Sequence, residues 1–182
     1  MEEDLVYWIA LNERPWVIPT SKVIIAYHEL RSLVALWEAP NSYLLSLGMN
    51  DKAIWAFNKF KSNVPFADLA NQVEMCREKN IDIIRLVDSE YPEQLKSIKD
   101  QFEGPPLVIF RKGRLKRFDN CVAIVGTRNC SFYGRMMARS LAQGLASRGY
   151  VIVSGLARGV DEWAHFGALE ARRGQTVAVL AW

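Results

Sequence analysis

Val122-Ala123-Ile124-Val125-Gly126-Thr127-Arg128 is the stretch that decides the fold. Its four apolar residues run without interruption into a glycine, which is typical of a buried parallel strand that ends in a loop. A helix is predicted from about residue 134 to 148, and Gly149 follows it as the expected C-cap residue. The order strand, glycine loop, helix predicts the first unit of a parallel α/β sheet.

The same order repeats toward the C-terminus. Residues 150–153 predict a second buried strand, which opens into the loop 154–161. A second helix to about residue 173 and a third strand at 176–180 complete half of a doubly wound, Rossmann-like sheet. A parallel strand is normally followed by a helix that covers it, yet the sequence stops at Trp182, so we expect a fragment or a naturally shortened member of a longer fold.

The first 80 residues predict short helices. Apolar residues spaced by three and four between Val23 and Trp37 predict one helix, and Asn50 is expected to cap another after a turn at Gly48. A further helix is predicted at 66–78. We therefore predict two domains, a small helical one at 1–80 and an incomplete Rossmann-like core at 81–182, which begins with strands at 81–86 and 107–110 around a short helix at 91–99.

The net charge of +3 over 182 residues is modest, but it is unevenly distributed. Residues 1–60 hold five Lys/Arg against seven Asp/Glu, whereas residues 121–182 hold seven against three, and all seven are arginines, which suit bidentate contact with phosphate. The basic stretch 111–117 is either a solvated turn or an outlying phosphate contact. The acidic N-terminus and the lack of a long apolar run predict a cytoplasmic protein.

Both glycine loops follow parallel strands, so they are expected at the same edge of the sheet, where ligands of such folds bind. Glycine lets the backbone approach a phosphate closely, and the next helix contributes amide donors. The glycines could instead serve packing alone, and Arg128 could form an internal ion pair. The candidate phosphate-binding residues of the two loops are Gly126, Thr127, Arg128, Ser154, Gly155, Arg158 and Gly159.

Catalysis finds little support in the sequence. Neither G-x-G-x-x-G nor G-x-x-x-x-G-K-[ST] is present, which argues against a dinucleotide or P-loop cofactor. Asp161 and His165 lie four residues apart on one helix face but are too few for a metal site, so we expect them to brace the loop. Cys130 and Ser131 lack an adjacent base, and the three cysteines show no metal-ligand spacing. No cofactor or metal is predicted.

These motifs together resemble the DNA-processing protein A (DprA/Smf) family. The resemblance is strong from about residue 90 onward, and the helical N-terminus looks like the sterile-alpha-motif or helix-hairpin-helix-like domain of that family. It is carried by four stretches in the right order: 122–128, Ser131-Phe132-Tyr133-Gly134, 153–161 and 164–169.

The resemblance implies a non-enzymatic protein that binds single-stranded DNA, loads a RecA-type recombinase and acts in natural transformation, with a homodimer as a further expectation. It implies that Arg128 contacts DNA, that 154–161 forms the other wall of the pocket, and that Ser131 belongs to the same site. Two alternatives stay open. One is a Rossmann-type nucleotide-binding enzyme resembling phosphoribohydrolases, although P-G-G-x-G-T-x-x-E is absent; the other is a truncated interaction remnant without strong DNA binding.

Overall fold

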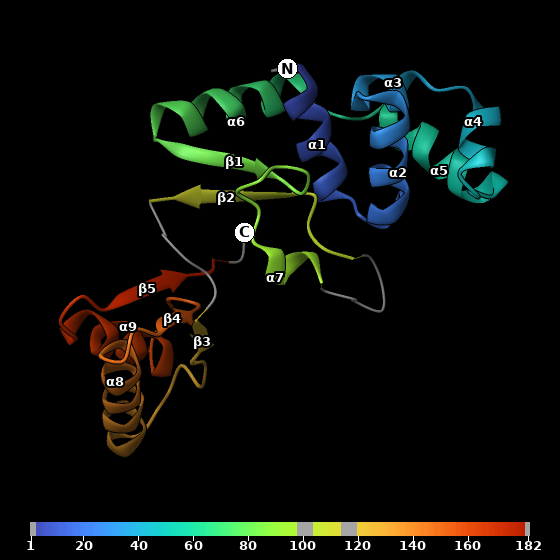
Figure 1. Ribbon diagram of the computed structural model, residues 1–182. Coiled ribbons are helices and arrows are strands. Elements are labelled where there is room, and N and C mark those ends of the chain that lie inside the picture. Colours follow the sequence, from blue (N-terminus) through green and yellow to red (C-terminus); the bar gives the residue numbers. More distant parts are fainter. Residues whose placement is uncertain (1–2, 98–103, 114–119, 181–182) are drawn as a thin grey trace. The chain divides into compact units, whose positions relative to one another are not determined.

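The computed structural model describes residues 3–97, 104–113 and 120–180, and the chain divides into two compact units, 1–113 and 114–182. Figure 1 shows both units. Part of the basic stretch, residues 114–117, lies outside the described residues, as do the end of the helix predicted at 91–99 and Trp182. No helix in the described part of the chain is long and apolar enough to cross a membrane.

The first unit consists of short helices followed by a two-stranded antiparallel sheet (Figure 1). In the sheet, Ile83 of β1 pairs with Phe110 of β2. The structure confirms the predicted helix at 66–78, both predicted strands and the cap at Asn50. The Oδ1 atom of Asn50 accepts a hydrogen bond from Ala53 N at 2.9 Å. The elements are α1 (Glu3–Glu13), α2 (Thr20–Leu30), α3 (Leu33–Glu38), α4 (Asn41–Ser46), α5 (Asp51–Lys61), α6 (Phe66–Glu78), β1 (Ile81–Arg85), α7 (Glu93–Lys96) and β2 (Val108–Lys112).

The single helix predicted between Val23 and Trp37 is wrong, because the chain breaks there into α2 and α3. Arg31 ends α2 in the left-handed conformation, with φ of 60°. Ser32 then begins α3, and its hydroxyl oxygen accepts hydrogen bonds from the backbone amides of Val34 at 3.1 Å and Ala35 at 3.5 Å. A left-handed residue followed by a serine cap stops one helix and starts the next, although the apolar spacing continues across the break.

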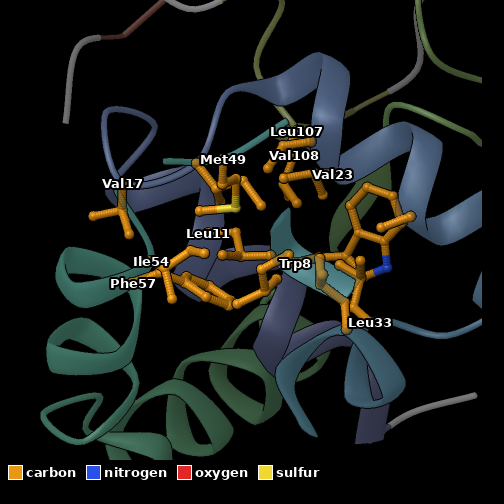
Figure 2. Packing of buried hydrophobic residues seen from close by; sticks show 14 residues of the cluster. Trp8, Leu11, Val17, Val23, Leu33, Met49, Ile54, Phe57, Leu107 and Val108 are labelled. Atoms are coloured by element: carbon orange, nitrogen blue, oxygen red, sulfur yellow. The ribbon is translucent and has the colours of Figure 1, made fainter. Parts of the chain in front are cut away.

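The core of the first unit includes residues of both its helices and its sheet. Trp8 and Phe57 are fully buried, and Leu107 and Val108 belong to the same cluster (Figure 2). The amide of Val108 also donates a hydrogen bond to Asn12 Oδ1 at 3.0 Å. Residues 81–113 therefore pack with the helices, and the structure divides the chain at 113, whereas the domain boundary predicted from the sequence lies at 80.

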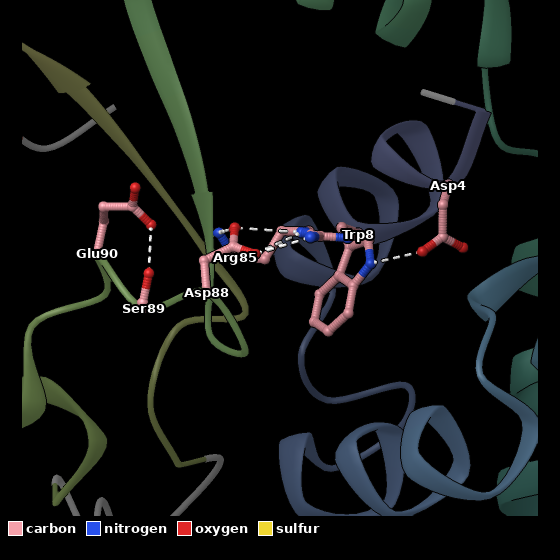
Figure 3. Close-up of polar contacts among 6 residues, drawn as sticks. All are labelled: Asp4, Trp8, Arg85, Asp88, Ser89 and Glu90. Carbon is pink, nitrogen blue, oxygen red and sulfur yellow. Dashed lines mark hydrogen bonds and ion pairs between the residues drawn. The ribbon is translucent and has the colours of Figure 1, made fainter. Parts of the chain in front are cut away.

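A second link joins α1 to the end of β1 (Figure 3). The Trp8 indole N–H donates to Asp4 at 3.0 Å, and the guanidinium of Arg85 lies 5.8 Å from the Trp8 ring centroid. Asp88 accepts from Arg85 Nη2 at 2.7 Å, and this hydrogen bond raises the pKa of Arg85. The Arg85 charge is therefore engaged within the first unit.

The second unit is a parallel α/β sheet with strand order β3-β4-β5. In register, Val122 pairs with Ile152, and Ile152 pairs with Thr176. The predicted alternation of strand and helix is confirmed. The elements are β3 (Cys121–Ala123), α8 (Phe132–Ala146), β4 (Val151–Ser154), α9 (Val160–Glu170) and β5 (Gln175–Ala178).

The prediction that 122–125 forms a buried strand is wrong in its burial. β3 covers only 121–123, and the Val125 side chain is 70% exposed. β3 is an outer strand of the three that the structure describes, so its residues lack neighbours on one side. The predicted burial holds for β4, in which Val151 and Ile152 are buried between two strands.

Small residues let α8 and α9 pack closely. Ala138, Ala142 and Ala146 of α8 are buried, and the latter two share a buried cluster with Ala164 and Ala168 of α9. At Gly167 of α9 an added Cβ would lie 2.1 Å from the carbonyl oxygen of Arg139 on α8. The two backbones are thus too close at this point for any side chain.

Candidate functional site

Two loops meet where β3 and β4 end. These strands are parallel neighbours, so the loop after each leaves the same edge of the sheet. The Ser154 hydroxyl donates a hydrogen bond to the carbonyl oxygen of Ile124 at 2.6 Å, and the amide of Val160 donates to the carbonyl oxygen of Thr127 at 3.2 Å. The structure therefore brings the predicted segments 126–128 and 154–159 together.

Asp161 links the two loops through its carboxylate. Oδ1 accepts a hydrogen bond from the amide of Gly126 at 3.2 Å, and Oδ2 accepts one from the amide of Gly155 at 3.1 Å. The side chain belongs to the first turn of α9 and is buried, with 7% of its surface exposed. Two backbone amides that could bind an external anion are thus already bound to an anion of the protein.

The loop glycines are required by close packing. Gly159 has a φ of 92°, and a Cβ there would lie 2.3 Å from the carbonyl oxygen of Thr127. A Cβ on Gly126 would lie 2.8 Å from Cγ2 of Val160. The packing role that the sequence left open for Gly126 therefore has a direct structural basis, and Gly159 has the same role, so both glycines keep the two loops in contact.

His165 lies one turn after Asp161 and is also buried. Its Nδ1 lies 2.7 Å from the hydroxyl of Thr176, and that hydroxyl donates its proton to the carbonyl oxygen of Ile152 at 2.7 Å. Thr176 must therefore accept from His165, so the imidazole carries its proton on Nδ1. Nε2 is buried and has no hydrogen-bond partner among the described residues.

This environment lowers the pKa of His165. Burial is the largest cause, because it penalises the charged imidazolium, and the nearby Asp161 carboxylate opposes it. A second proton would go to Nε2, which has no acceptor within the described part of the chain. His165 is therefore held neutral and serves to tie α9 to β4 and β5.

The exposed cations of the site are Arg128 and Arg158. Both side chains lie at the surface, and neither forms an ion pair within residues 3–97, 104–113 and 120–180. Their backbones adjoin, because a Cβ on Gly159 would lie 2.7 Å from the carbonyl oxygen of Arg128. The internal ion pair considered for Arg128 is absent from the described residues, and the two guanidinium groups are available to a ligand.

Of the three candidate hydroxyls, that of Ser154 is buried and donates its proton to the carbonyl oxygen of Ile124, so the structure does not support its predicted contact with phosphate. The other two, of Thr127 and Ser131, are exposed and also have local roles. Thr127 Oγ1 accepts a hydrogen bond from the amide of Asn129 at 3.1 Å, in a turn on the surface. Ser131 caps α8, and its Oγ accepts from the amide of Gly134 at 3.1 Å. Neither of these two hydroxyls donates a hydrogen bond to another described residue, so each can donate its proton to a phosphate oxygen.

Other chemistry is sparse in the parts of the chain that the structure describes. They contain no group of three or more His, Cys, Asp or Glu side chains that could hold a metal ion. The thiol of Cys130 is partly buried, and Cys76 is buried in the first unit. Arg139 of α8 pairs with Glu170 of α9, with Nε 2.8 Å from Oε2.

One contributor to the site carried no local signal in the sequence. Thr176 lies eleven residues after His165 on a strand, and its hydroxyl reaches the imidazole only because β5 pairs with β4 in the observed register. Helical periodicity places Asp161 and His165 on one helix face, but it does not indicate that Thr176 is the partner of His165.

Comparison with known proteins gives a consistent result. A family-wide sequence profile described as DNA recombination-mediator protein A matches residues 82–182. The chain is 39% identical over 107 residues to the DNA processing protein DprA of Bacillus subtilis, covering 58% of this chain and 34% of that protein. It is 33% identical over 181 residues to Protein Smf of Synechocystis, covering 96% of this chain and 43% of that protein.

A solved structure also resembles the chain as a whole. The DNA processing protein A (DprA) from Streptococcus pneumoniae superposes with a TM-score of 0.69 at 26% identity, covering 96% of this chain and 57% of that chain. The predicted α/β fold with a helical N-terminal region is thereby confirmed. The chain spans between 34% and 57% of the length of these three proteins.

Proposed function

Because the chain belongs to the DNA recombination-mediator protein A family, we propose that it binds the sugar-phosphate backbone of single-stranded DNA through the loops that carry Arg128 and Arg158. The observation that carries the proposal is the pair of exposed arginines on adjoining loops, with no ion pair in the described part of the chain. Exposed guanidinium groups without an ion-pair partner suit bidentate contact with phosphate.

The role of the surrounding residues follows from the hydrogen bonds. Since Asp161 already binds the amides of Gly126 and Gly155, these glycines act by shaping the loops rather than by donating to DNA. Thr127 and Ser131 add hydroxyl donors beside the arginines. Asp161 and His165 hold the loops on the sheet, and the role proposed for the site is binding rather than catalysis.

The family membership supports a wider proposal. The relative in Bacillus subtilis is a DNA processing protein, and we extend to this protein a role in DNA recombination and natural transformation, with a RecA-type recombinase and a second copy of the chain as partners. We also propose an evolutionary domain boundary at 80, because the family match begins at residue 82. A cytoplasmic location fits this role.

The test is the binding of a fluorescently labelled oligothymidylate, followed by anisotropy at several salt concentrations. We expect affinity to fall as salt rises, because phosphate contacts release counterions. Arg128→Ala and Arg158→Ala should each weaken binding about 5- to 50-fold, corresponding to the loss of one charged hydrogen-bonding partner. Unchanged affinity in both variants would overturn the proposed site.

Arg172→Ala is the matched control. Arg172 is exposed and lies just beyond the C-terminal end of α9, whereas the loops lie at its N-terminal end. An 11-residue helix is about 16 Å long, so this arginine is distant from the proposed site. Incubation with nucleoside monophosphates tests the alternative, and release of free base would favour an enzyme.

A further inference from the structure

The helical unit presents a tryptophan that its core does not use. Trp55 of α5 is 64% exposed, whereas Trp8 in the same unit is fully buried. An indole is large and apolar, so leaving it in water forgoes a sizeable free energy of burial. Its neighbours Ile54 and Phe57 are both buried, so α5 is anchored without it.

Lysines flank Trp55 on the same face of the helix. Lys52 and Lys59 lie three residues before and four residues after it, which places all three side chains side by side. Both lysines are exposed, and Lys59 Nζ lies 5.0 Å from the centroid of the Trp55 ring. Neither lysine forms an ion pair with another described residue.

The other charged residues of α5 have structural explanations. Lys61 donates a hydrogen bond to the carbonyl oxygen of Trp37 at 2.9 Å and lies 5.0 Å from the Phe57 ring, and burial lowers its pKa. Asp51 stands in the first turn, where the helix dipole favours a carboxylate. Lys59 lies in the last turn, where the helix dipole favours a cation, but this role does not require an indole beside it. Lys52 and Trp55 have no comparable structural role among the described residues.

We propose that Lys52, Trp55 and Lys59 form a second contact for the same single-stranded DNA, an inference that rests on the proposed function for its ligand. One base stacks on the Trp55 indole, and the two lysines contact the phosphates on either side. An exposed aromatic ring between cations is the arrangement by which proteins hold single strands without reading their sequence. A protein partner is disfavoured, because the cores of such interfaces are depleted in lysine and need more apolar area than one side chain.

Anisotropy of the full chain with a labelled 20-nucleotide oligothymidylate tests the proposal. Trp55→Ala should weaken binding by at least about 5-fold, the lower end of what stacking on one base contributes, and Trp55→Phe should retain most of the affinity. The double variant Lys52→Ala/Lys59→Ala should make the salt dependence shallower by about 1.4 in the slope of log affinity against log salt. Ile25→Ala, which removes a 49% exposed apolar side chain from α2, should bind like the parent chain.

Photochemical cross-linking gives an independent readout. Trypsin cleaves after Lys52 and Lys59, so Trp55 is released in the peptide 53–59. After irradiation with oligothymidylate, this peptide should carry a nucleotide adduct. Unchanged affinity of Trp55→Ala together with an unmodified peptide would overturn the proposal and assign the surface to a protein partner.

These experiments distinguish the helical contact at Trp55 from the loop site at Arg128 and Arg158. If Arg128→Ala and Arg158→Ala bind normally while peptide 53–59 cross-links, the loop site fails and the helical contact stands. If the arginine variants lose binding while Trp55→Ala does not, the reverse holds. In an Arg128→Ala background, the remaining binding should fall further with Trp55→Ala.

Discussion

His165 Nδ1 donates a hydrogen bond to the Thr176 hydroxyl, which lies 2.7 Å away and passes its own proton to the Ile152 carbonyl oxygen. One imidazole thus joins α9 to the two strands β5 and β4. Because Nε2 is buried without a partner among the described residues, this arrangement accommodates only the neutral ring.

The stability of the second unit should therefore depend on pH through His165. Its pKa is lowered in the folded chain, so the unfolded chain binds the proton more readily. The stabilisation is complete above the unfolded pKa of about 6.5 and is lost as pH falls below that value toward the folded pKa. Urea unfolding between pH 8 and pH 5 should show this loss, which His165→Gln should largely remove.

Replacing Asp161 by asparagine should loosen the two loops. The amide group retains one acceptor oxygen but turns a donor toward the amide of Gly126 or Gly155. We expect unfolding to become easier by about 1–3 kcal/mol, the usual cost of leaving a buried donor unpaired. Urea titration measures it, with Glu162→Gln, an exposed carboxylate in the same helical turn, as the control. Equal effects of the two substitutions would contradict the bridging role.

Two glycines in α8 and α9 should respond to alanine in opposite ways. Gly167→Ala places a methyl group 2.1 Å from the carbonyl oxygen of Arg139, so the helices must separate. A cost of about 1–3 kcal/mol is expected from overpacking. Gly144→Ala meets only Arg148 Nη1 at 3.5 Å and should stabilise by about 0.5–1 kcal/mol through helix propensity. Thermal or urea unfolding of both variants decides the matter, and a stabilising Gly167→Ala would refute the close packing.

Adjacent substitutions at the break between α2 and α3 should also have opposite signs. Arg31→Gly removes the side chain that disfavours the left-handed conformation, so it should stabilise the folded chain by up to about 1 kcal/mol. Ser32→Ala removes the cap of α3 and should destabilise by about 1 kcal/mol. Urea midpoints measured on both single variants test the pair. A loss of stability in Arg31→Gly would show that the arginine side chain contributes more than its backbone costs.

Local pattern was sufficient for much of the fold. Apolar runs predicted the three parallel strands of the second unit, the first two of which lead into glycine loops, and Asn50 marked the start of α5. The pattern failed at Arg31, because the left-handed residue there is an arginine, and the apolar spacing of an unbroken helix continues past it. Glycine at that position would have signalled the end of the helix.

Features that depend on distant neighbours could not be predicted in this way. Val125 is as apolar as Val151, yet it is 70% exposed because it lies in the loop beyond the end of β3, whereas Val151 lies in β4 between two strands. In the candidate site, the sequence indicated that the two loops share an edge. The sequence did not indicate that Asp161 binds the amides of Gly126 and Gly155. These residues lie 35 and 6 positions before Asp161, and they come together only when the two strands pair.

The position of Asp161 has a consequence for how the loops meet their ligand. The Asp161 carboxylate is part of the chain, so it cannot be diluted or exchanged as a free ion can. Buffer phosphate or sulfate therefore cannot bind the two amides that Asp161 occupies. The spacing of the loops is thereby fixed before any polyanion arrives, and association requires little reorganisation of the backbone. Under the proposed function, competing ions should therefore act on the arginine side chains and the neighbouring hydroxyls, and not on the amides of Gly126 and Gly155.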